Sequence, residues 1–403
     1  MSHCSMLRIE SGHTKIRASV TLPGSKSISN RFLILKEILG AATEADNLST
    51  AGDTRILVQS LDMIRNSPSG AIDIGQAGTD MRFLTAFLAA TGGEWVLTGS
   101  ERMKQRPVGE LVECLRSMDA DIEYLEEEKF PPLRIRGKKL KGGEVEIMAD
   151  VSSQFISALL LIAPLMENPL VLNLRGKIVS RPYIGMTLGL LRRFGFQSVE
   201  GSRRIEVIPR KRKRNPPLYV IESDWSSASY YYSICALSAD ASIELKHLSR
   251  KSLQADARVS EIYSKLGIQT MYRANSVLLT NSGEHIREFN YDFSECPDIA
   301  QTVAVTCFGL GIPARLSGIS TLRFKETDRV AALKNELLKI GALVEEKDSE
   351  LLIIPDNGIK AGKEPVIETY DDHRMAMSFA IAGLKIPGVR IQNPGCVDKT
   401  YPG

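Results

Sequence analysis

The chain has 403 residues, a mass of 44.4 kDa and a formal net charge of +3, with 43% hydrophobic and 25% charged residues. This length supports two or three domains with cores of their own, and the composition excludes collagen-like, coiled-coil and disordered proteins. The longest nearly apolar run, residues 155–166, is too short to span a bilayer, and Pro164 interrupts it. The first residues do not resemble a signal or transit peptide, so we expect a cytoplasmic protein with no membrane association.

The cysteines and histidines are scattered rather than grouped. Six cysteines include no CxxC pair, and five histidines include no HExxH motif. The sequence therefore predicts neither a disulfide framework nor a metal site.

Six segments that open with Ser, Gly, Pro or Asp and continue as apolar helical runs recur along the chain. They begin at residues 25, 78, 152, 226, 297 and 371, so the intervals from the second onward are 71 to 74 residues, whereas the first is 53. A second helical pattern and short alternating strands lie between them, for example at 203–210, 275–283 and 349–358. We interpret this as six copies of an α/β unit with the small-residue helices buried, and the regular spacing argues against a chance alignment of ordinary amphipathic helices.

Residues 210–220, RKRKRNPPLYV, form the most basic stretch of the chain. A nucleic-acid patch and a solvated turn near a domain boundary both fit this composition. We favour the turn because no aromatic residues alternate with the basic ones, and we expect no nucleic-acid partner.

Several of the repeated helix starts carry charged or polar side chains within their first turn. Free N–H groups and positive partial charge at a helix N-terminus attract anions, and nearby cations strengthen that attraction. A single such start is more often just a capped helix, but several that converge would bind a ligand with more than one negative group. The residues concerned are Lys26, Ser27 and Arg31; Gly78, Thr79 and Arg82; Ser152, Ser153 and Gln154; and Asp372, His373 and Arg374.

The stretch FKETDRVAAL adds a charged helix start at residues 324–333. If Lys325 lies on the helix it shares a face with Arg329, which suits an anion clamp, while Glu326 points elsewhere and could transfer a proton. An exposed helix start laced with ion pairs is the alternative. Asp298 is similarly either an N-cap or a proton-accepting carboxylate, and His373 either makes a cap-region hydrogen bond or relays a proton.

These motifs, taken together, closely resemble the 5-enolpyruvylshikimate-3-phosphate synthase family, which belongs to the enolpyruvyl transferases. The resemblance runs in collinear order over nearly the whole chain. Its motifs are LPGSKSISNR (22–31), AGTDMRFL (77–84), LTGSERMKQRP (97–107), SSQF (152–155), SRPY (180–183), DWSSASY (224–230), PDIAQT (297–302), FKETDR (324–329), DDHRMAM (371–377) and DKTYP (398–402).

The resemblance implies an α/β fold, a two-domain inside-out α/β barrel of six βαβαββ repeat units. One domain is expected at residues 24–223, mainly on the shikimate 3-phosphate side, and the other at 1–23 and 224–403. In this family the domains close over substrate.

The activity implied is that of a 3-phosphoshikimate 1-carboxyvinyltransferase in the pathway to chorismate and the aromatic amino acids. The enolpyruvyl group of phosphoenolpyruvate passes to the 5-hydroxyl of shikimate 3-phosphate through a tetrahedral intermediate, and phosphate is released. No metal or organic cofactor is implied, the partners are the two small-molecule substrates, a monomer is expected, and the herbicide glyphosate should compete with phosphoenolpyruvate.

The family's functional residues map onto matching motifs of this sequence. The shikimate 3-phosphate residues are Lys26, Ser27, Arg31, Ser152, Ser153, Gln154, Ser180, Asp298, Thr321 and Lys325. The phosphoenolpyruvate residues are Lys26, Gly78, Arg106, Gln154, Arg329, Arg374 and Lys399. Catalysis is assigned to Asp298 as base, Glu326 as acid and Lys26.

Three positions depart from the family pattern: Gln76 and Thr321 where the family often has Asn, and Asp80 where a small residue is usual. Asp80 adds negative charge near an expected anion site and could shift its affinity. The nearest alternative is the related transferase acting on UDP-N-acetylglucosamine, which the SKSISNR and KETDR motifs disfavour. A non-catalytic anion-binding protein on the same scaffold is the other alternative, which the presence of Lys26, Asp298 and Glu326 disfavours.

Overall fold

The computed structural model describes residues 6–10, 15–40, 43–150, 152–178, 180–209, 218–347, 350–356 and 364–401. The chain forms two compact units. Unit 1 comprises Met1–Gly24 and Glu222–Gly403, and unit 2 comprises Ser25–Ile221. Most of the basic stretch at 210–220, residues 210–217, lies outside the described residues.

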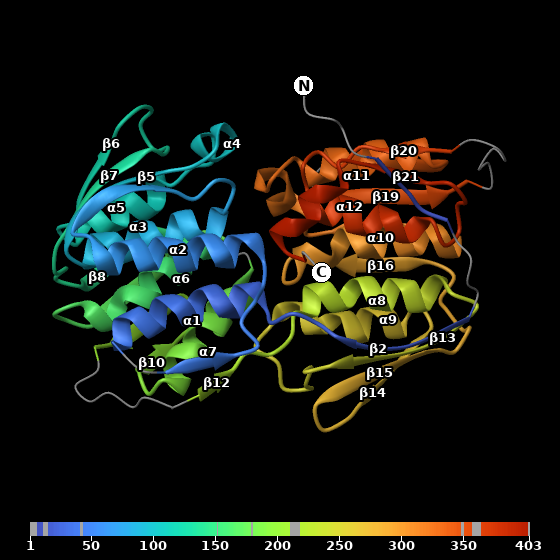
Figure 1. Ribbon diagram of the computed structural model, residues 1–403, viewed down its shortest axis with the longest axis horizontal. Helices are drawn as coiled ribbons and strands as arrows, with labels where there is room; N and C mark the ends of the chain where they lie inside the picture. The colour runs from blue at the N-terminus through green and yellow to red at the C-terminus, as the bar shows by residue number, and fades with distance from the viewer. Residues whose placement is uncertain are drawn as a thin grey trace. The chain divides into compact units, whose positions relative to one another are not determined.

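Four four-stranded sheets share one topology (Figure 1). In each, the first two strands in sequence pair in parallel, and the last two form an antiparallel hairpin whose final strand pairs with the second. Unit 2 holds β4 (Ser69–Asp73), β5 (Gly93–Thr98), β6 (Asp121–Tyr124) and β7 (Leu133–Gly137), then β8 (Gly143–Met148), β9 (Leu170–Arg175), β10 (Gln197–Glu200) and β11 (Arg204–Ile208). Unit 1 holds β2 (Lys15–Thr21), β13 (Asp240–Lys246), β14 (Ile268–Tyr272) and β15 (Ser276–Asn281), then β16 (Phe289–Asp292), β17 (Ala314–Ser317), β18 (Ala342–Lys347) and β19 (Glu350–Pro355).

Each of these four repeats also contains two helices, because neighbouring strands that pair in parallel need a crossover connection. An inner helix precedes the second strand: α3 (Gly78–Ala90), α6 (Ser153–Ile162), α8 (Trp225–Leu237) and α10 (Ala300–Leu310). In three of the repeats this helix follows the first strand directly, whereas the segment that forms unit 2 is inserted between β2 and α8. An outer helix joins the second and third strands: α5 (Gly109–Ser117), α7 (Arg181–Arg193), α9 (Val259–Ser264) and α11 (Arg329–Lys339). The order is therefore βαβαββ four times.

The two remaining repeats are shortened. In unit 2, β12 (Leu218–Val220) pairs in parallel with β3 (Glu44–Asp46), and the helices are α1 (Lys26–Leu39) and α2 (Gly52–Asn66). Only Ser67 and Pro68 separate α2 from β4, which leaves no room for a hairpin and explains the short first interval of the sequence repeat.

In unit 1, the shortened repeat lies at the end of the chain. There β20 (Val366–Ile367) and β21 (Arg390–Gln392) flank α12 (His373–Ala382), and β1 (Met6–Arg8) pairs antiparallel with β21. A strand from the start of the chain thus takes the place that the hairpin strand has in the complete repeats.

The inner helices are buried nearly all round. In unit 2, α1, α3 and α6 contact one another, and in unit 1 the same holds for α8, α10 and α12 (Figure 1). Small and hydroxyl residues at these contacts allow close approach, and their hydroxyls pair across helices, as in Ser233–Thr306 at 2.7 Å and Thr302–Ser378 at 3.2 Å. No helix of the described residues combines the length and apolarity needed to cross a membrane.

Candidate active site

Asp298 is the centre of a charged cluster in unit 1. It lies in η3 (Pro297–Ile299), the turn that leads into α10. Its Oδ1 lies 3.4 Å from Lys325 Nζ and 3.2 Å from Arg329 Nη1, and its Oδ2 lies 3.3 Å from Arg374 Nη2. Burial alone would raise the pKa of Asp298, but the charges of Arg374, Lys325 and Arg329 outweigh it and hold that pKa well below its usual range. The carboxylate is therefore ionised.

Arg329 joins Asp298 to two further carboxylates. It is the first residue of α11, which begins here because the Asp328 side chain accepts hydrogen bonds from two main-chain amides of the first turn. The guanidinium is 2% exposed, with Nε 2.6 Å from Asp372 Oδ2 and Nη2 2.7 Å from Glu326 Oε2. Burial lowers the pKa of Arg329, but Asp372, Glu326 and Asp298 outweigh it and raise the pKa overall, so the guanidinium stays charged.

Glu326 also contacts a cation from the end of the chain. Lys399 is the last residue of η5 (Pro394–Lys399), which packs against α12, and its Nζ lies 2.9 Å from Glu326 Oε1. Asp372, the N-cap of α12, accepts a 2.8 Å hydrogen bond from the amide of Arg374. Seven side chains thus form what we call the Asp298 cluster: Asp298, Glu326, Asp372, Lys325, Arg329, Arg374 and Lys399.

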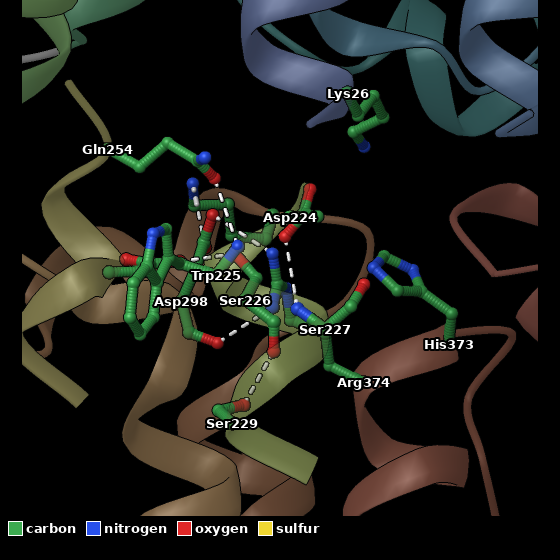
Figure 2. A network of polar contacts seen from close by, with 12 residues as sticks. Lys26, Asp224, Trp225, Ser226, Ser227, Ser229, Gln254, Asp298, His373 and Arg374 are labelled. Atoms are coloured by element: carbon green, nitrogen blue, oxygen red, sulfur yellow. Dashed lines mark hydrogen bonds and ion pairs between the residues drawn. The ribbon is translucent and has the colours of Figure 1, made fainter. Parts of the chain in front are cut away.

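The start of α8 adds a capped helix end in the same unit. Asp224 accepts a 3.0 Å hydrogen bond from the amide of Ser227, and Gln254 Oε1 accepts one of 3.0 Å from the amide of Trp225 (Figure 2). Two of the orphan donors at this helix start are therefore already satisfied by protein groups.

In unit 2, Lys26 and Arg31 lie on α1. Lys26 Nζ lies 2.9 Å from Asp53 Oδ2, in the first turn of α2. Arg31 is 2% exposed and donates to Thr187 Oγ1 at 2.8 Å and Ser157 Oγ at 3.1 Å. Burial lowers the pKa of Arg31 to about 10, which keeps the guanidinium charged at neutral pH.

The starts of α3 and α6 meet through a side-chain hydrogen bond. Ser152, the N-cap of α6, accepts from the amide of Gln154, and Gln154 Nε2 donates to Thr79 Oγ1 at 3.3 Å. Gly78 is the first residue of α3, and the Arg106 guanidinium packs directly against it. Cationic groups and free helix starts make unit 2, like unit 1, suited to anionic ligands.

Within the described ranges, no group of three or more His, Cys, Asp or Glu side chains is arranged to hold a metal ion. The chemistry available to the cluster is charge stabilisation by Lys and Arg and proton transfer by carboxylates.

The family model described as EPSP synthase (3-phosphoshikimate 1-carboxyvinyltransferase) matches residues 11–69 and 66–403. The chain is 44% identical over 394 residues to the 3-phosphoshikimate 1-carboxyvinyltransferase of a Bacteroides fragilis strain, covering 98% of this chain and 95% of that protein. It is 36% identical over 411 residues to the enzyme of the same name from a Vibrio cholerae strain, covering 96% and 95%. The chain belongs to the EPSP synthase family.

The fold agrees with a solved member of the EPSP synthase family. The structure of EPSP synthase from Acinetobacter baumannii superposes with a TM-score of 0.77 at 23% identity, covering 98% of this chain and 96% of that one. The family and the two-domain α/β fold predicted from the sequence are therefore confirmed.

The structure gathers most of the residues carried over from the EPSP synthase motifs. In unit 1, Asp298, Lys325, Glu326, Arg329, Arg374 and Lys399 lie in one network, and Thr321 lies in η4 (Ser320–Phe324) just before it. In unit 2, Ser153 follows the N-cap of α6 and Ser180 is the N-cap of α7. The carbonyl of Ser27 accepts a 2.9 Å hydrogen bond from Arg31.

Two expectations about the KETDR motif are wrong. Lys325 does not lie on a helix, because Asp328 caps α11 and the helix begins only at Arg329. Glu326 does not point away from the two cations but contacts Arg329 directly. Lys325 and Arg329 still meet at Asp298, through a turn rather than through helical spacing.

Two residues near the start of α3 make buried contacts that the sequence did not predict. Arg82 is buried and donates to the carbonyls of Gly78 and Pro107 at 3.0 and 2.9 Å, so it holds the loop after α4 (Glu101–Lys104) against α3. Asp80 is fully buried and accepts a 2.6 Å hydrogen bond from Asn30. This hydrogen bond lies where α1 packs against α3.

Sequence reasoning missed Asp53, which pairs with Lys26, and the buried Asp256 beside α8. Asp53 carries one recognisable signal, a carboxylate in the first turn of a helix that follows a strand. Nothing in the sequence indicates that Asp256 is buried.

Proposed function

We propose that this chain transfers the enolpyruvyl group of phosphoenolpyruvate to the 5-hydroxyl of shikimate 3-phosphate and releases phosphate. The observation that carries this proposal is the Asp298 cluster, in which two carboxylates suited to proton transfer are held among four cations, in a chain of the EPSP synthase family. Both substrates carry a phosphate and a carboxylate, which Lys and Arg bind through charge-assisted hydrogen bonds.

Asp298 is the base that takes the proton of the 5-hydroxyl. In the free protein three cations stabilise its charged form, which makes it a weak base. Anionic substrates that bind Arg374 and Lys325 offset the charge of these cations, so the pKa of Asp298 rises towards the range that proton transfer needs. Substrate binding therefore activates the base.

Glu326 is the acid that protonates the methylene carbon of phosphoenolpyruvate. It lies between Arg329 and Lys399, two cations that then stabilise the carboxylate left after proton transfer. The hydroxyl oxygen bonds to the adjacent carbon, which gives a tetrahedral ketal. Glu326 then takes a proton back from the new methyl group, and the proton held by Asp298 passes to the departing phosphate, which restores the enolpyruvyl double bond and both carboxyl groups.

The remaining site residues are assigned to one or both of the two substrates. In unit 2, Lys26, Ser27, Arg31, Ser152, Ser153, Gln154 and Ser180 bind shikimate 3-phosphate, together with Thr321 and Lys325 of unit 1. Phosphoenolpyruvate binds Gly78, Arg106, Arg329, Arg374 and Lys399, with Lys26 and Gln154 contacting both ligands. The protein acts as a monomer in the cytoplasm, which light scattering and cell fractionation would test.

The decisive experiment measures phosphate release from phosphoenolpyruvate by the purified protein. Release should require shikimate 3-phosphate, and release supported by UDP-N-acetylglucosamine instead would assign the chain to the related transferase. No release with either acceptor would make it a binding protein.

Asp298→Asn tests the base within this reaction. It should lower kcat by about 100- to 10,000-fold while calorimetry still detects substrate binding. Asp240→Asn, at an exposed residue paired with Arg17, is the matched control and should turn over normally. Near-normal turnover by Asp298→Asn would remove Asp298 from the mechanism.

A further inference from the structure

Asp256 is a buried carboxyl group in unit 1 that the mechanism above does not use. It lies in η2 (Ala255–Arg258), which packs against α8, and it is 3% exposed. Its Oδ2 accepts a hydrogen bond from Ser226 Oγ in the first turn of α8. Its Oδ1 is buried and has no hydrogen-bond partner in the part of the chain that the structure describes. Ionising a carboxyl group whose buried oxygen accepts no hydrogen bond would cost free energy.

The charged and titratable groups that act on Asp256 come from α8, α12 and the region of η3. They are Asp298 of η3, Arg374 of α12, Asp224 at the start of α8, and Cys296 just before η3. Burial raises the pKa of Asp256 to about 7, and the negative charges of Asp298 and Asp224 act in the same direction. Arg374 and the Ser226 hydrogen bond oppose this rise without cancelling it.

The protonation state of Asp256 affects how much of the charge of Arg374 is available to an anionic ligand. Asp298 and Asp224 already place two negative charges near Asp256, and Arg374 is the positive charge that acts on it. An ionised Asp256 would add a third negative charge there and would compete for the charge of Arg374. A neutral Asp256 leaves it intact.

We propose that Asp256 is a positioning residue for Arg374, and that it stays protonated while the site binds its anionic substrate, leaving the charge of Arg374 to that anion. The inference rests on the proposed function, in which Arg374 binds phosphoenolpyruvate. Loss of the Asp256 proton to solvent as the pH rises weakens phosphoenolpyruvate binding, and substrate binding in turn favours uptake of that proton.

The first test is the pH dependence of KM for phosphoenolpyruvate in the full-length protein. In the wild type, KM should rise about tenfold per pH unit above pH 7, because only the neutral form of Asp256 binds the anion well. Asp256→Asn keeps the shape and the neutrality of the protonated side chain, so its KM should match the wild type at pH 6 and stay flat to pH 9. Changes in the ionisation of phosphoenolpyruvate itself affect both proteins equally. A KM that rises in parallel in both proteins would overturn the proposal.

A second variant, Ser226→Ala, should shift the pH dependence of KM in a direction that the proposal predicts. Removing the hydroxyl that stabilises the ionised form raises the pKa of Asp256, so the increase in KM should begin at a higher pH than in the wild type. Ser233→Ala, on the same helix and paired with Thr306 instead, is the matched control and should leave the profile unchanged. A shift to lower pH in Ser226→Ala would contradict the proposal.

An infrared titration of the unliganded protein tests Asp256 independently of turnover. The protonated-carboxyl band should disappear near pH 7 in the wild type and be missing from Asp256→Asn, while Asp240→Asn should keep it. Identical spectra of the wild type and Asp256→Asn would refute the protonated state even if the protein is an active transferase. If the band behaves as expected but no phosphate is released, it is the proposed function that fails.

Discussion

Replacing Gly78 with alanine should displace the guanidinium of Arg106 without harming the fold. A Cβ at position 78 would lie 2.5 Å from Nη1 and 2.6 Å from Nη2 of Arg106, whereas carbon atoms in good contact need about 3.5–4.0 Å. The guanidinium must therefore move by roughly 1 Å. The change itself should not destabilise the helix, because alanine loses less backbone entropy than glycine on folding.

The expected cost falls on phosphoenolpyruvate binding. A charge-assisted hydrogen bond contributes about 1.5–3 kcal/mol, so losing one from Arg106 should raise KM for phosphoenolpyruvate by about 10- to 100-fold. Steady-state phosphate release measures KM, and thermal unfolding checks that the melting temperature does not fall. Gly92→Ala, just after α3, is the matched control, because a Cβ there meets no atom within 4 Å.

A double-mutant cycle decides whether Arg106 is the cause. If Gly78→Ala acts by moving Arg106, the two changes should not be additive: adding Gly78→Ala to Arg106→Ala should change KM little further. Full additivity, or an unchanged KM in Gly78→Ala alone, would refute this reasoning.

Three further outcomes are expected from buried polar groups. Asp80→Ala leaves the Asn30 amide without its acceptor and should lower the free energy of unfolding by about 1–3 kcal/mol, with KM for phosphoenolpyruvate within about twofold of the wild type; a large change in KM would contradict our placement of Asp80. Arg329→Lys replaces a guanidinium that contacts three carboxylates by a single point charge and should cost about 3–5 kcal/mol in urea unfolding; a loss below about 1 kcal/mol would show that the pairs are weak. Asp256→Asn should be more stable than the wild type by about 4 kcal/mol above pH 7. Folding raises the pKa of Asp256 to about 7, so the wild type loses stability as the pH rises from about 4 to about 7. Equal stability of the two proteins at pH 8 in urea unfolding would argue against that pKa.

The repeat architecture could be predicted from the sequence because it depends on spacing. The helix starts at residues 78, 152, 226, 297 and 371 each lead into an inner helix, and the alternating strands at 203–210, 275–283 and 349–358 contain β11, β15 and β19. The shortened first interval gave no indication of which element was missing. Only the structure shows that the repeat containing α1 and α2 lacks a hairpin.

The members of the charged cluster could be predicted, but their pairing could not. Helical spacing suggested that Lys325 and Arg329 share a helix face, yet the Asp328 cap starts the helix later and a turn brings the two together. The sequence predicts negative charge at Asp80 near an anion site, but not the burial of this carboxylate or the hydrogen bond that it accepts from Asn30 on another helix. Such contacts join residues dozens of positions apart, which local periodicity does not encode.

The way unit 1 is assembled from both ends of the chain constrains its synthesis. Residues 25–221 are contiguous and leave the ribosome with every strand and helix of their unit, whereas β2 must wait for β13, and β1 must wait for β21 at Arg390–Gln392. Until then these early strands present unpaired edges, the kind of backbone that invites aggregation or chaperone capture. A chain whose synthesis stops before Gln392 therefore contains the whole segment that forms unit 2 but only part of the strands that form unit 1.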